Sequence, residues 1–330
     1  MTDSSAQNFY PLELDRFLSP RLWGGERLVA FLNLSWPKDR EPLGESWQIY
    51  GENRVLNGRF QSKTLDEVSA ELGPELIGTV AFGRYGNTFP LLAKFIEAAD
   101  NLSIQVHPDD EYAHSREAAS GFHGKAEAWL ILDAAPGATI IWGFKDALSP
   151  EEVKAAAAEE RLEPHLNFVS VKAGDVIYNP AGTVHATGAG IFLFEIQQTS
   201  DLTYRLYDYG RRDNQGNLRA LHIDQALEVA NLIPGEHARV TPKVLGGGKA
   251  ELVRTEFFAM QHWDVDGVLN EMTDPSSAEL LTALSGELTL RAGEHELVLT
   301  QGTSCVLPAA LGTYSLEGRG IVLRCYIPAS

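Results

Sequence analysis

The sequence contains very little cysteine. Only Cys305 and Cys325 occur among its 330 residues, which excludes the disulfide frameworks of small secreted proteins. Cysteine pairs that bind metal or act in catalysis usually lie closer together or have histidine between them. We therefore expect two reduced, packed thiols in a cytoplasmic protein.

Long apolar runs are also absent. No stretch approaches the roughly eighteen apolar residues that a membrane-spanning helix needs. The opening "MTDSSAQNFY" lacks a basic region followed by an apolar one, which a secretory signal would have. The sequence therefore predicts no membrane partner and no export.

Positive charge is scarce. Lys and Arg number 27 against 45 Asp and Glu, so the net charge is −18. Such a chain repels nucleic acid and anionic membrane surfaces, although a pocket on it can still be locally basic for a small anionic substrate. The glycine-rich "LGGGKAE" at 245–251 lacks the spacing of a P-loop and is expected to be a linker.

What the sequence does contain is β-pattern. From about residue 90 the chain alternates, as in "LSIQVH" and "KAEAWLIL", and short strands with turn signals recur from about 250 to the end. Capping boxes or helical spacing predict a few helices, at 64–78, 149–162 and 222–232. The length suggests two domains or one large β-rich unit with additions.

A faint internal repeat supports two related β-barrels. Segments 173–186 and 301–314 share a Gly followed six residues later by Pro. Five residues beyond that Pro, the first copy has His185 and the second has Thr313. We interpret the first barrel as equipped for chemistry and the second as degenerate.

Four side chains on separate strands are candidate metal ligands. Gln105 and His107 lie at i and i+2, so they share a strand face about 6.6 Å apart. Glu127 and His185 lie on later strands, and all four have apolar neighbours that would bury the opposite face and leave them in need of partners. This donor set suits Zn²⁺ with an open position, but it could also hold Fe²⁺ or Mn²⁺. The remaining histidines are expected at the surface or in hydrogen bonds: His114, His123, His165, His222, His237, His262 and His295.

Seven motifs of the sequence are distinctive when taken together: "RLWGG" (21–25), "GESWQI" (44–49), "PLLAKFIEA" (90–98), "QVHP" (105–108), "GKAEAW" (124–129), "GD…NPAGTVHA" (174–186) and "EIQQTSDLTYRLYDYGR" (195–211). They resemble the short bacterial form of the type I mannose-6-phosphate isomerases, a family of zinc-dependent cupins. The resemblance is strong over roughly residues 15 to 235 and only weakly cupin-like in the C-terminal hundred. The sequence departs from the family pattern at Ala126, where many relatives have Thr or Pro, and at Asn179, where an apolar residue is usual.

The resemblance implies a mainly β fold of two cupin-type, jelly-roll barrels with a few helices and a degenerate C-terminal barrel. We expect a catalytic domain at 1–240, with an N-terminal extension and helical insertions, and a cupin-like β domain without a metal site at 241–330. It also implies one Zn²⁺ per chain on Gln105, His107, Glu127 and His185.

The implied reaction interconverts mannose 6-phosphate and fructose 6-phosphate, a phosphorylated hexose pair, through a cis-enediol. Arg205 matches the family's catalytic arginine, and Lys94, Lys125 and Glu195 match its active-site positions. The base could be Glu195, Lys125 or a metal-bound water. From the residues alone, Arg205 could instead pair with Asp201 or Asp208.

Two further substrate contacts follow from strand faces. Ser103 shares the face of Gln105 and His107, and Tyr207 is expected to share the face of Thr203 and Arg205. Together with Lys94 they are the candidate substrate-binding residues. We expect the protein to act as a monomer or a homodimer.

Two other functions stay open at this stage. One is a cupin sugar-binding module without turnover, against which the intact ligand set and Arg205 argue. The other is a His/Glu-ligated Fe²⁺ cupin oxygenase, which the glutamine ligand and the neighbouring lysines fit poorly.

Overall fold

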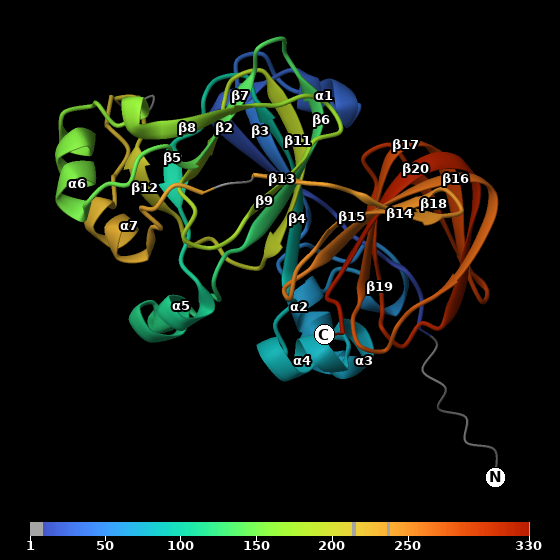
Figure 1. Cartoon of the computed structure of the whole chain (residues 1–330). Helices are drawn as coiled ribbons and strands as arrows, with labels where there is room; N and C mark the ends of the chain where they lie inside the picture. The colour runs from blue at the N-terminus through green and yellow to red at the C-terminus, as the bar shows by residue number, and fades with distance from the viewer. Residues whose placement is uncertain (1–8, 213–215, 236–237, 330) are drawn as a thin grey trace. The chain divides into compact units, whose positions relative to one another are not determined.

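A computed structural model describes residues 9–212, 216–235 and 238–329, and this part of the chain is mainly β-sheet (Figure 1). None of its helices combines the length and apolar composition that a membrane span requires. The chain divides into two compact units, which we call unit 1 and unit 2. Unit 1 comprises Met1–Phe17, Gln48–Leu91 and Pro242–Ser330, and unit 2 comprises Leu18–Trp47 and Leu92–Thr241.

These units differ from the expected domains in one respect. Residues 1–17 and 48–91 cluster with 242–330 rather than with the rest of the N-terminal part. Backbone hydrogen bonds are one reason, since Ala278 donates to Ile77 and Ala309 donates to Leu76. The division of function between 1–240 and 241–330 stays a prediction.

Unit 2 is a sandwich of two antiparallel sheets. The strand orders are β13-β9-β6-β11-β4-β3-β2 and β12-β5-β10-β7-β8. Trp23 and Trp129 from the first sheet and Trp142 from the second share one hydrophobic core, so the two sheets pack face to face. The strands are β2 (Phe17–Gly25), β3 (Leu43–Ile49), β4 (Leu91–Ala98), β5 (Ile104–Val106), β6 (Glu127–Ala134), β7 (Thr139–Phe144), β8 (Leu166–Ser170), β9 (Val176–Asn179), β10 (His185–Thr187), β11 (Ile191–Gln198), β12 (Tyr204–Tyr207) and β13 (Arg239–Val240).

Helices cover the outer face of the five-stranded sheet. Val153 of α6 (Pro150–Ala158) and Ala226 of α7 (Ile223–Val229) are buried with Ile104 and Tyr204 in a second cluster. Figure 1 shows both helices beside β8 and β12. This outer packing makes β5 and β12 buried strands whose other side chains face the sandwich interior. The remaining helices of unit 2 are α1 (Arg27–Phe31), α5 (Asp110–Arg116), η2 (Ala118–Ser120) and η3 (Glu163–His165).

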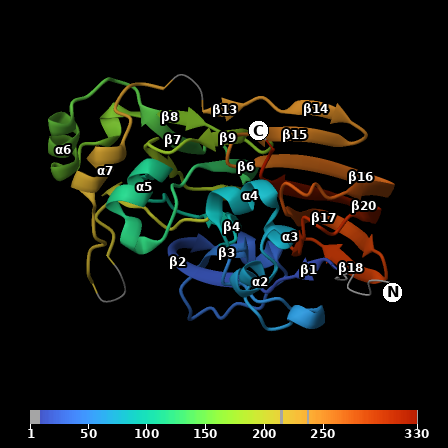
Figure 2. The same ribbon diagram turned by 90° about the horizontal axis from the view of Figure 1, so that it is seen from below.

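Unit 1 is built around long antiparallel strands, which Figure 2 shows side by side in orange and red. Trp263, Leu281 and Leu323 are buried, and the first two lie in its main core. The strand order is β1-β19-β17-β20-β16-β15-β14, with β18 on β17. The strands are β1 (Leu12–Glu13), β14 (Lys243–Gly246), β15 (Lys249–Arg254), β16 (Ala259–Met272), β17 (Glu279–Ala292), β18 (His295–Thr300), β19 (Ser304–Leu307) and β20 (Thr313–Tyr326).

The expected helices are present but shorter. Thr64 caps α2 (Leu65–Leu72) in a capping box with Glu67, as predicted, yet the helix stops at Gly73, whose φ is 53°. Pro74 follows directly and starts a separate turn of helix. The other helices of unit 1 are η1 (Gly58–Phe60), α3 (Pro74–Ile77) and α4 (Thr79–Tyr85).

Both cysteines of the chain lie in unit 1. Cys305 and Cys325 are buried free thiols, as expected.

The internal repeat is visible in the backbone. Gly174 and Gly302 both have positive φ, of 88° and 78°. Each glycine is followed by a short strand, β9 or β19, that ends at the residue before the proline. The next strands, β10 and β20, begin at His185 and Thr313. No group of candidate metal ligands occurs in the described part of unit 1, and the absence of a metal site from 241–330 stays a prediction.

A substitution at Gly78 tests how closely the helices of unit 1 pack against the segment around Ser276. Its φ is +90°, and a Cβ there would lie 2.3 Å from backbone atoms of Ser276. We expect Gly78→Ala to lower the free energy of unfolding by about 1–3 kcal/mol in urea titrations. Gly83→Ala is the control, because nothing lies within 4 Å of its added Cβ, and it should be neutral or slightly stabilising. Equal stability of the two variants would contradict the close packing.

Candidate metal centre

A cavity in unit 2 is lined by side chains from both sheets. Lys94 and Glu195 reach it from β4 and β11, whereas Gln105 and Arg205 reach it from β5 and β12. Because the two sheets face each other, the cavity brings together residues that are far apart in the sequence. Its lining is dominated by charged groups and tryptophans, including Arg21, Trp23, Glu45, Trp47, Lys125, Trp129, Asp201 and Arg219.

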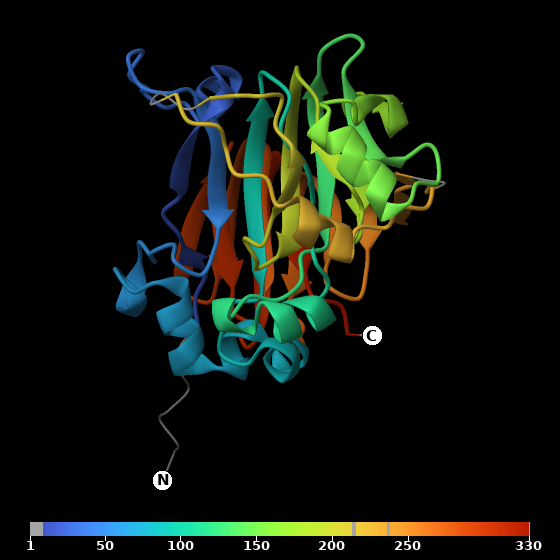
Figure 3. The same ribbon diagram turned by 90° about the vertical axis from the view of Figure 1, so that its left-hand side faces the viewer.

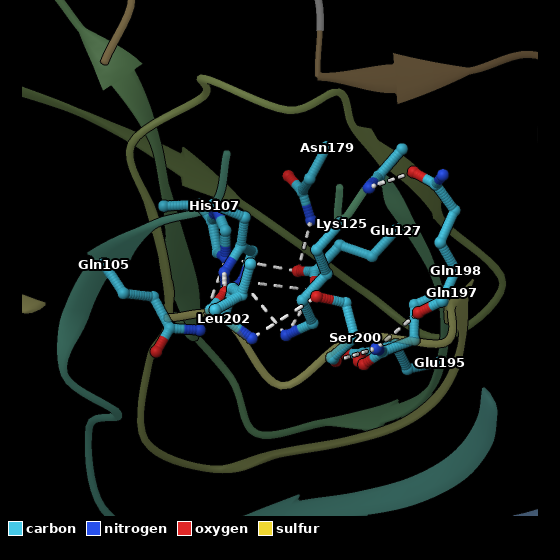
Figure 4. Close-up of polar contacts among 12 residues, drawn as sticks. Gln105, His107, Lys125, Glu127, Asn179, Glu195, Gln197, Gln198, Ser200 and Leu202 are labelled. Atoms are coloured by element: carbon cyan, nitrogen blue, oxygen red, sulfur yellow. Dashed lines mark hydrogen bonds and ion pairs between the residues drawn. The ribbon is translucent and has the colours of Figure 1, made fainter. Parts of the chain in front are cut away.

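Three of the four predicted ligands converge beside this cavity. The Nε2 atom of His185 lies 3.1 Å from Glu127 Oε1, and the Nε2 atom of His107 lies 3.4 Å from Glu127 Oε2. All three side chains are buried, and their ligand atoms lie within 4.8 Å of one another. In Figure 4 the dashed lines join His107 and Glu127 across the two sheets. This is a group that could hold a metal ion.

Strand pairing explains the convergence. His185, the first residue of β10, lies directly opposite Gln105 of β5. His107 follows the end of β5, where Pro108 stops the strand. Glu127 is the first residue of β6, which belongs to the other sheet.

Both imidazoles are oriented by backbone carbonyls. His107 donates its Nδ1–H to the Leu202 carbonyl at 2.8 Å, and His185 donates its Nδ1–H to the Thr183 carbonyl at 2.8 Å. With its Nδ1 atom bonded to a carbonyl, each ring directs its Nε2 atom inward, which is the usual arrangement of metal-binding histidines. Burial and the Lys125 ammonium lower the pKa of His107 to about 3, so this ring stays neutral.

Glu127 needs a positive partner. Burial alone would raise the pKa of its carboxyl group, but the Lys125 ammonium holds that pKa well below its usual range. Its Oε2 atom accepts no hydrogen bond from any described residue, although Lys125 Nζ lies 3.3 Å away. Lys125 Nζ also lies 3.1 Å from His107 Nε2, so one positive charge is already beside the group. A divalent ion bound between the two Nε2 atoms and the carboxylate would stabilise the buried charge further. The residues therefore fit a bound divalent metal.

Gln105 lies beside this group with its amide reversed. Its Nε2 atom is 3.4 Å from His185 Nε2, and its Oε1 atom is 3.4 Å from the Ser103 hydroxyl. A half-turn of the amide would direct the oxygen toward the histidines. Ser103 itself is buried and lines the cavity, as the shared strand face predicts.

Lys94 and Glu195 form a buried ion pair next to the candidate ligands. Their Nζ and Oε1 atoms lie 3.0 Å apart, and Trp129 donates its indole N–H to the other Glu195 oxygen at 2.8 Å. Burial and the charge of Glu127 raise the pKa of Glu195. Burial would lower the pKa of Lys94, but Glu195 and Glu45 raise it, so the ammonium stays charged.

Arg205 is free of the ion pairs that the sequence left open. Asp208 pairs with Arg211 and lies 3.6 Å from Arg219 instead. The Arg205 Nε atom is buried without a hydrogen-bond partner among the described residues, and the side chain lines the cavity. Burial and the neighbouring Arg219 lower its pKa from the ordinary value. The guanidinium group is thus held in the cavity and open to a ligand.

Tyr207 does not share the face of Arg205, and that expectation was wrong. Arg205 lies opposite Gln105, but a bulge follows, and Tyr207 lies opposite Ile104. The extra residue reverses the alternation of side chains. Tyr207 consequently packs against the cluster under α6 and α7 instead of lining the cavity.

Sequence reasoning missed two arginines of the cavity. Arg21 lies in the "RLWGG" motif and donates to Glu45 Oε2 at 3.0 Å, while Arg219 follows the region that the structure leaves undescribed. The motif was a signal that could have pointed to Arg21. Arg219 sits in no pattern that distinguishes it from a surface arginine, and only the fold brings it near Arg205.

Comparison with known proteins identifies the family. A family model for the type I phosphomannose isomerase catalytic domain matches residues 12–128. A second model, for the cupin domain of mannose-6-phosphate isomerase, matches residues 249–327. The mainly β, cupin-type fold expected from the sequence is thereby confirmed.

Curated relatives match along nearly their whole length. The mannose-6-phosphate isomerase of Streptococcus mutans is 37% identical over 93% of this chain and 95% of its own. The mannose-6-phosphate isomerase ManA of Bacillus subtilis is 36% identical, and the match covers 93% of the present chain and 96% of the ManA chain. The crystal structure of the mannose 6-phosphate isomerase from Bacillus subtilis has a TM-score of 0.84 at 32% identity, covering 96% of this chain and 99% of that one.

A zinc-bound mannose 6-phosphate isomerase structure shares the fold, with a TM-score of 0.78 at 19% identity, covering 97% of this chain and all of that one. The likeness to the Bacillus and Streptococcus relatives extends over both units of the present chain. On this evidence the resemblance noted in the sequence is confirmed, and the chain belongs to the type I phosphomannose isomerase family.

Proposed function

We propose that the protein interconverts mannose 6-phosphate and fructose 6-phosphate as a zinc-dependent aldose–ketose isomerase. The observation that carries the proposal is the buried group of His107, Glu127 and His185 beside a cavity that also contains lysine, glutamate and arginine side chains. The names of the curated relatives support the same substrate pair.

Zn²⁺ would be held by His107, Glu127, His185 and, after rotation of its amide, Gln105. Two imidazoles, a carboxylate and an amide oxygen are ligands that Zn²⁺ accepts. When bound, the ion supplies Lewis-acid polarisation of a substrate oxygen. The zinc-bound structure that shares the fold supports this choice of metal.

Glu195 and Lys125 suit the two kinds of proton transfer that the reaction needs. A carboxylate of raised pKa suits the proton on C2, which leaves as the C1–C2 double bond of the enediol forms and is returned to C1 in the ketose. The ammonium of Lys125 can give a proton to the carbonyl oxygen on C1 as the enediol forms, and the resulting amine can take the hydroxyl proton from the oxygen on C2 as the ketone forms. Lys94 keeps Glu195 oriented, and Ser103 is placed to contact a sugar hydroxyl.

The arginines suit the phosphate. Arg21, Arg205 and Arg219 line one cavity, and the positive charges of Arg219 and Arg21 lower the pKa of Arg205. A dianionic group would relieve that repulsion and satisfy the unpaired Nε of Arg205. Arg205 can thus bind the phosphate or stabilise the enediolate, and Arg219 belongs to phosphate binding alone.

Metal removal tests the central assignment. Chelation should abolish the formation of fructose 6-phosphate from mannose 6-phosphate, and Zn²⁺ should restore it. His185→Ala should lose the bound metal while circular dichroism remains native, because the backbone pairing of β10 with β5 and β7 does not depend on the ring. His165→Ala, a half-exposed histidine on η3, is the control and should keep both metal and activity.

Unchanged metal content in His185→Ala would remove it from the ligand set. Turnover that resists chelation would overturn the metal's role. A folded, metal-loaded protein without turnover on phosphohexoses would favour the sugar-binding module instead.

Arg219→Ala tests phosphate binding. Removing one charge-assisted hydrogen bond of about 1.5–3 kcal/mol should raise KM for mannose 6-phosphate roughly tenfold to a hundredfold, with little change in metal content. Arg212→Ala is a matched control, since that arginine is exposed and donates to the Gly216 carbonyl. A normal KM in steady-state assays of Arg219→Ala would contradict the assignment.

A further inference from the structure

A second group of metal-binding side chains lies outside the cavity. Asp110, His114 and His123 bring their ligand atoms within 4.8 Å of one another, and none of the three lines the cavity described above. We propose that they form a second, solvent-accessible binding site for a divalent transition-metal ion.

Helix geometry places two of the ligands. Asp110 and His114 stand four residues apart in α5, so their side chains lie on the same face of the helix. Figure 3 shows α5 in green, running across the lower part of the view. His123 comes from the segment after the helix, and its Nδ1 atom lies 2.8 Å from His114 Nε2. Two imidazole nitrogens and a carboxylate oxygen therefore face one point.

The chain holds His123 against the helix by several bonds. The N–H of Gly124 donates to Asp110 Oδ1 at 2.8 Å, and the N–H of Lys125 donates to the Pro108 carbonyl at 2.9 Å. Ser200 donates its hydroxyl to the His123 carbonyl at 2.8 Å. A Cβ at Gly124 would lie 2.5 Å from the Asp109 carbonyl carbon, so glycine is required for this close approach.

The carboxylate is oriented as a ligand would be. Asp110 Oδ1 accepts hydrogen bonds from Gly124 N and, at 3.1 Å, from Gln198 Nε2. These two hydrogen bonds hold the Oδ1 atom of Asp110 in place and so fix the orientation of its carboxyl group. Metal-binding carboxylates in proteins are oriented by neighbouring hydrogen-bond donors in the same way. The site is therefore more ordered than a chance meeting of surface side chains.

The two imidazoles are suited to exchange their mutual bond for a metal. One ring must donate an N–H to the other, so the pair contains a neutral acceptor ring, and burial and His114 lower the pKa of His123. Nitrogens bonded to one Zn²⁺ at about 2.0–2.1 Å stand farther apart than 2.8 Å, so the rings must separate slightly. His114 is exposed and can rotate.

The donor set indicates the chemical class of ion. Two nitrogens and one oxygen suit Zn²⁺, Co²⁺, Ni²⁺ or Cu²⁺ better than Mg²⁺ or Ca²⁺, which prefer oxygen. With three protein ligands, water would complete the coordination. Because the site is partly exposed and has fewer protein ligands, we expect it to bind more weakly than the buried group.

Zinc titration of the purified protein tests the site. Equilibrium dialysis against ZnCl₂, followed by elemental analysis, should give two equivalents for the wild type. His114→Ala and Asp110→Asn should each weaken the second equivalent at least tenfold and leave the first in place. His165→Ala should retain both. Mg²⁺ at the same concentration should not compete.

His185→Ala separates this proposal from the proposed function. That variant lacks a ligand of the buried group, yet it should still bind one equivalent, which a further His114→Ala change removes. A wild type that binds one equivalent only, or a second equivalent that persists in His114→Ala/His123→Ala, would overturn the proposal. Native circular dichroism shows that each variant has folded, and the variants that keep His185 should also retain the first equivalent.

Discussion

The arrangement of side chains inside unit 2 depends on how the buried carboxylate of Glu127 is stabilised. An ionised carboxylate out of water is costly unless positive or hydrogen-bonding groups surround it. Lys125 supplies a positive charge 3.3 Å away, and Asn179 donates a hydrogen bond at 3.4 Å. His107 and His185 lie against the same carboxylate and must be held in place by other parts of the chain. The carbonyls of Leu202 and Thr183 orient the imidazoles, and the pairing of β5 with β10 sets one strand against the other.

Unit 1 also contains a buried carboxylate, and there protein side chains alone stabilise it. In unit 1 the buried Glu279 accepts from Arg324 at 2.6 Å and from the Tyr314 hydroxyl at 2.7 Å. The Arg324 guanidinium lies 5.3 Å from the Trp263 ring centroid. A protein cation and a hydroxyl thus satisfy this carboxylate. The repeated turn is therefore compatible with either solution, and the side chains inside the barrel decide which one forms.

Local rules predicted those parts of the fold and of the site that depend on a single strand or helix. The spacing of Gln105 and His107 and the capping box at Thr64 needed only the period of a strand or the start of a helix. The place of Tyr207 could not be predicted, because a single bulge reverses the face of every following residue. Arg219 was missed for a different reason, since its nearness to Arg205 arises only from the tertiary fold.

The proposed ligands come from different layers of the sandwich. Gln105 and His185 belong to the five-stranded sheet and His107 directly follows it, whereas Glu127 belongs to the seven-stranded sheet. An ion bound to all of them would act as a cross-link between layers in a chain whose two cysteines are both free. Because the complete ligand set exists only when both layers are in place, bound metal would stabilise the folded sandwich over the unfolded chain.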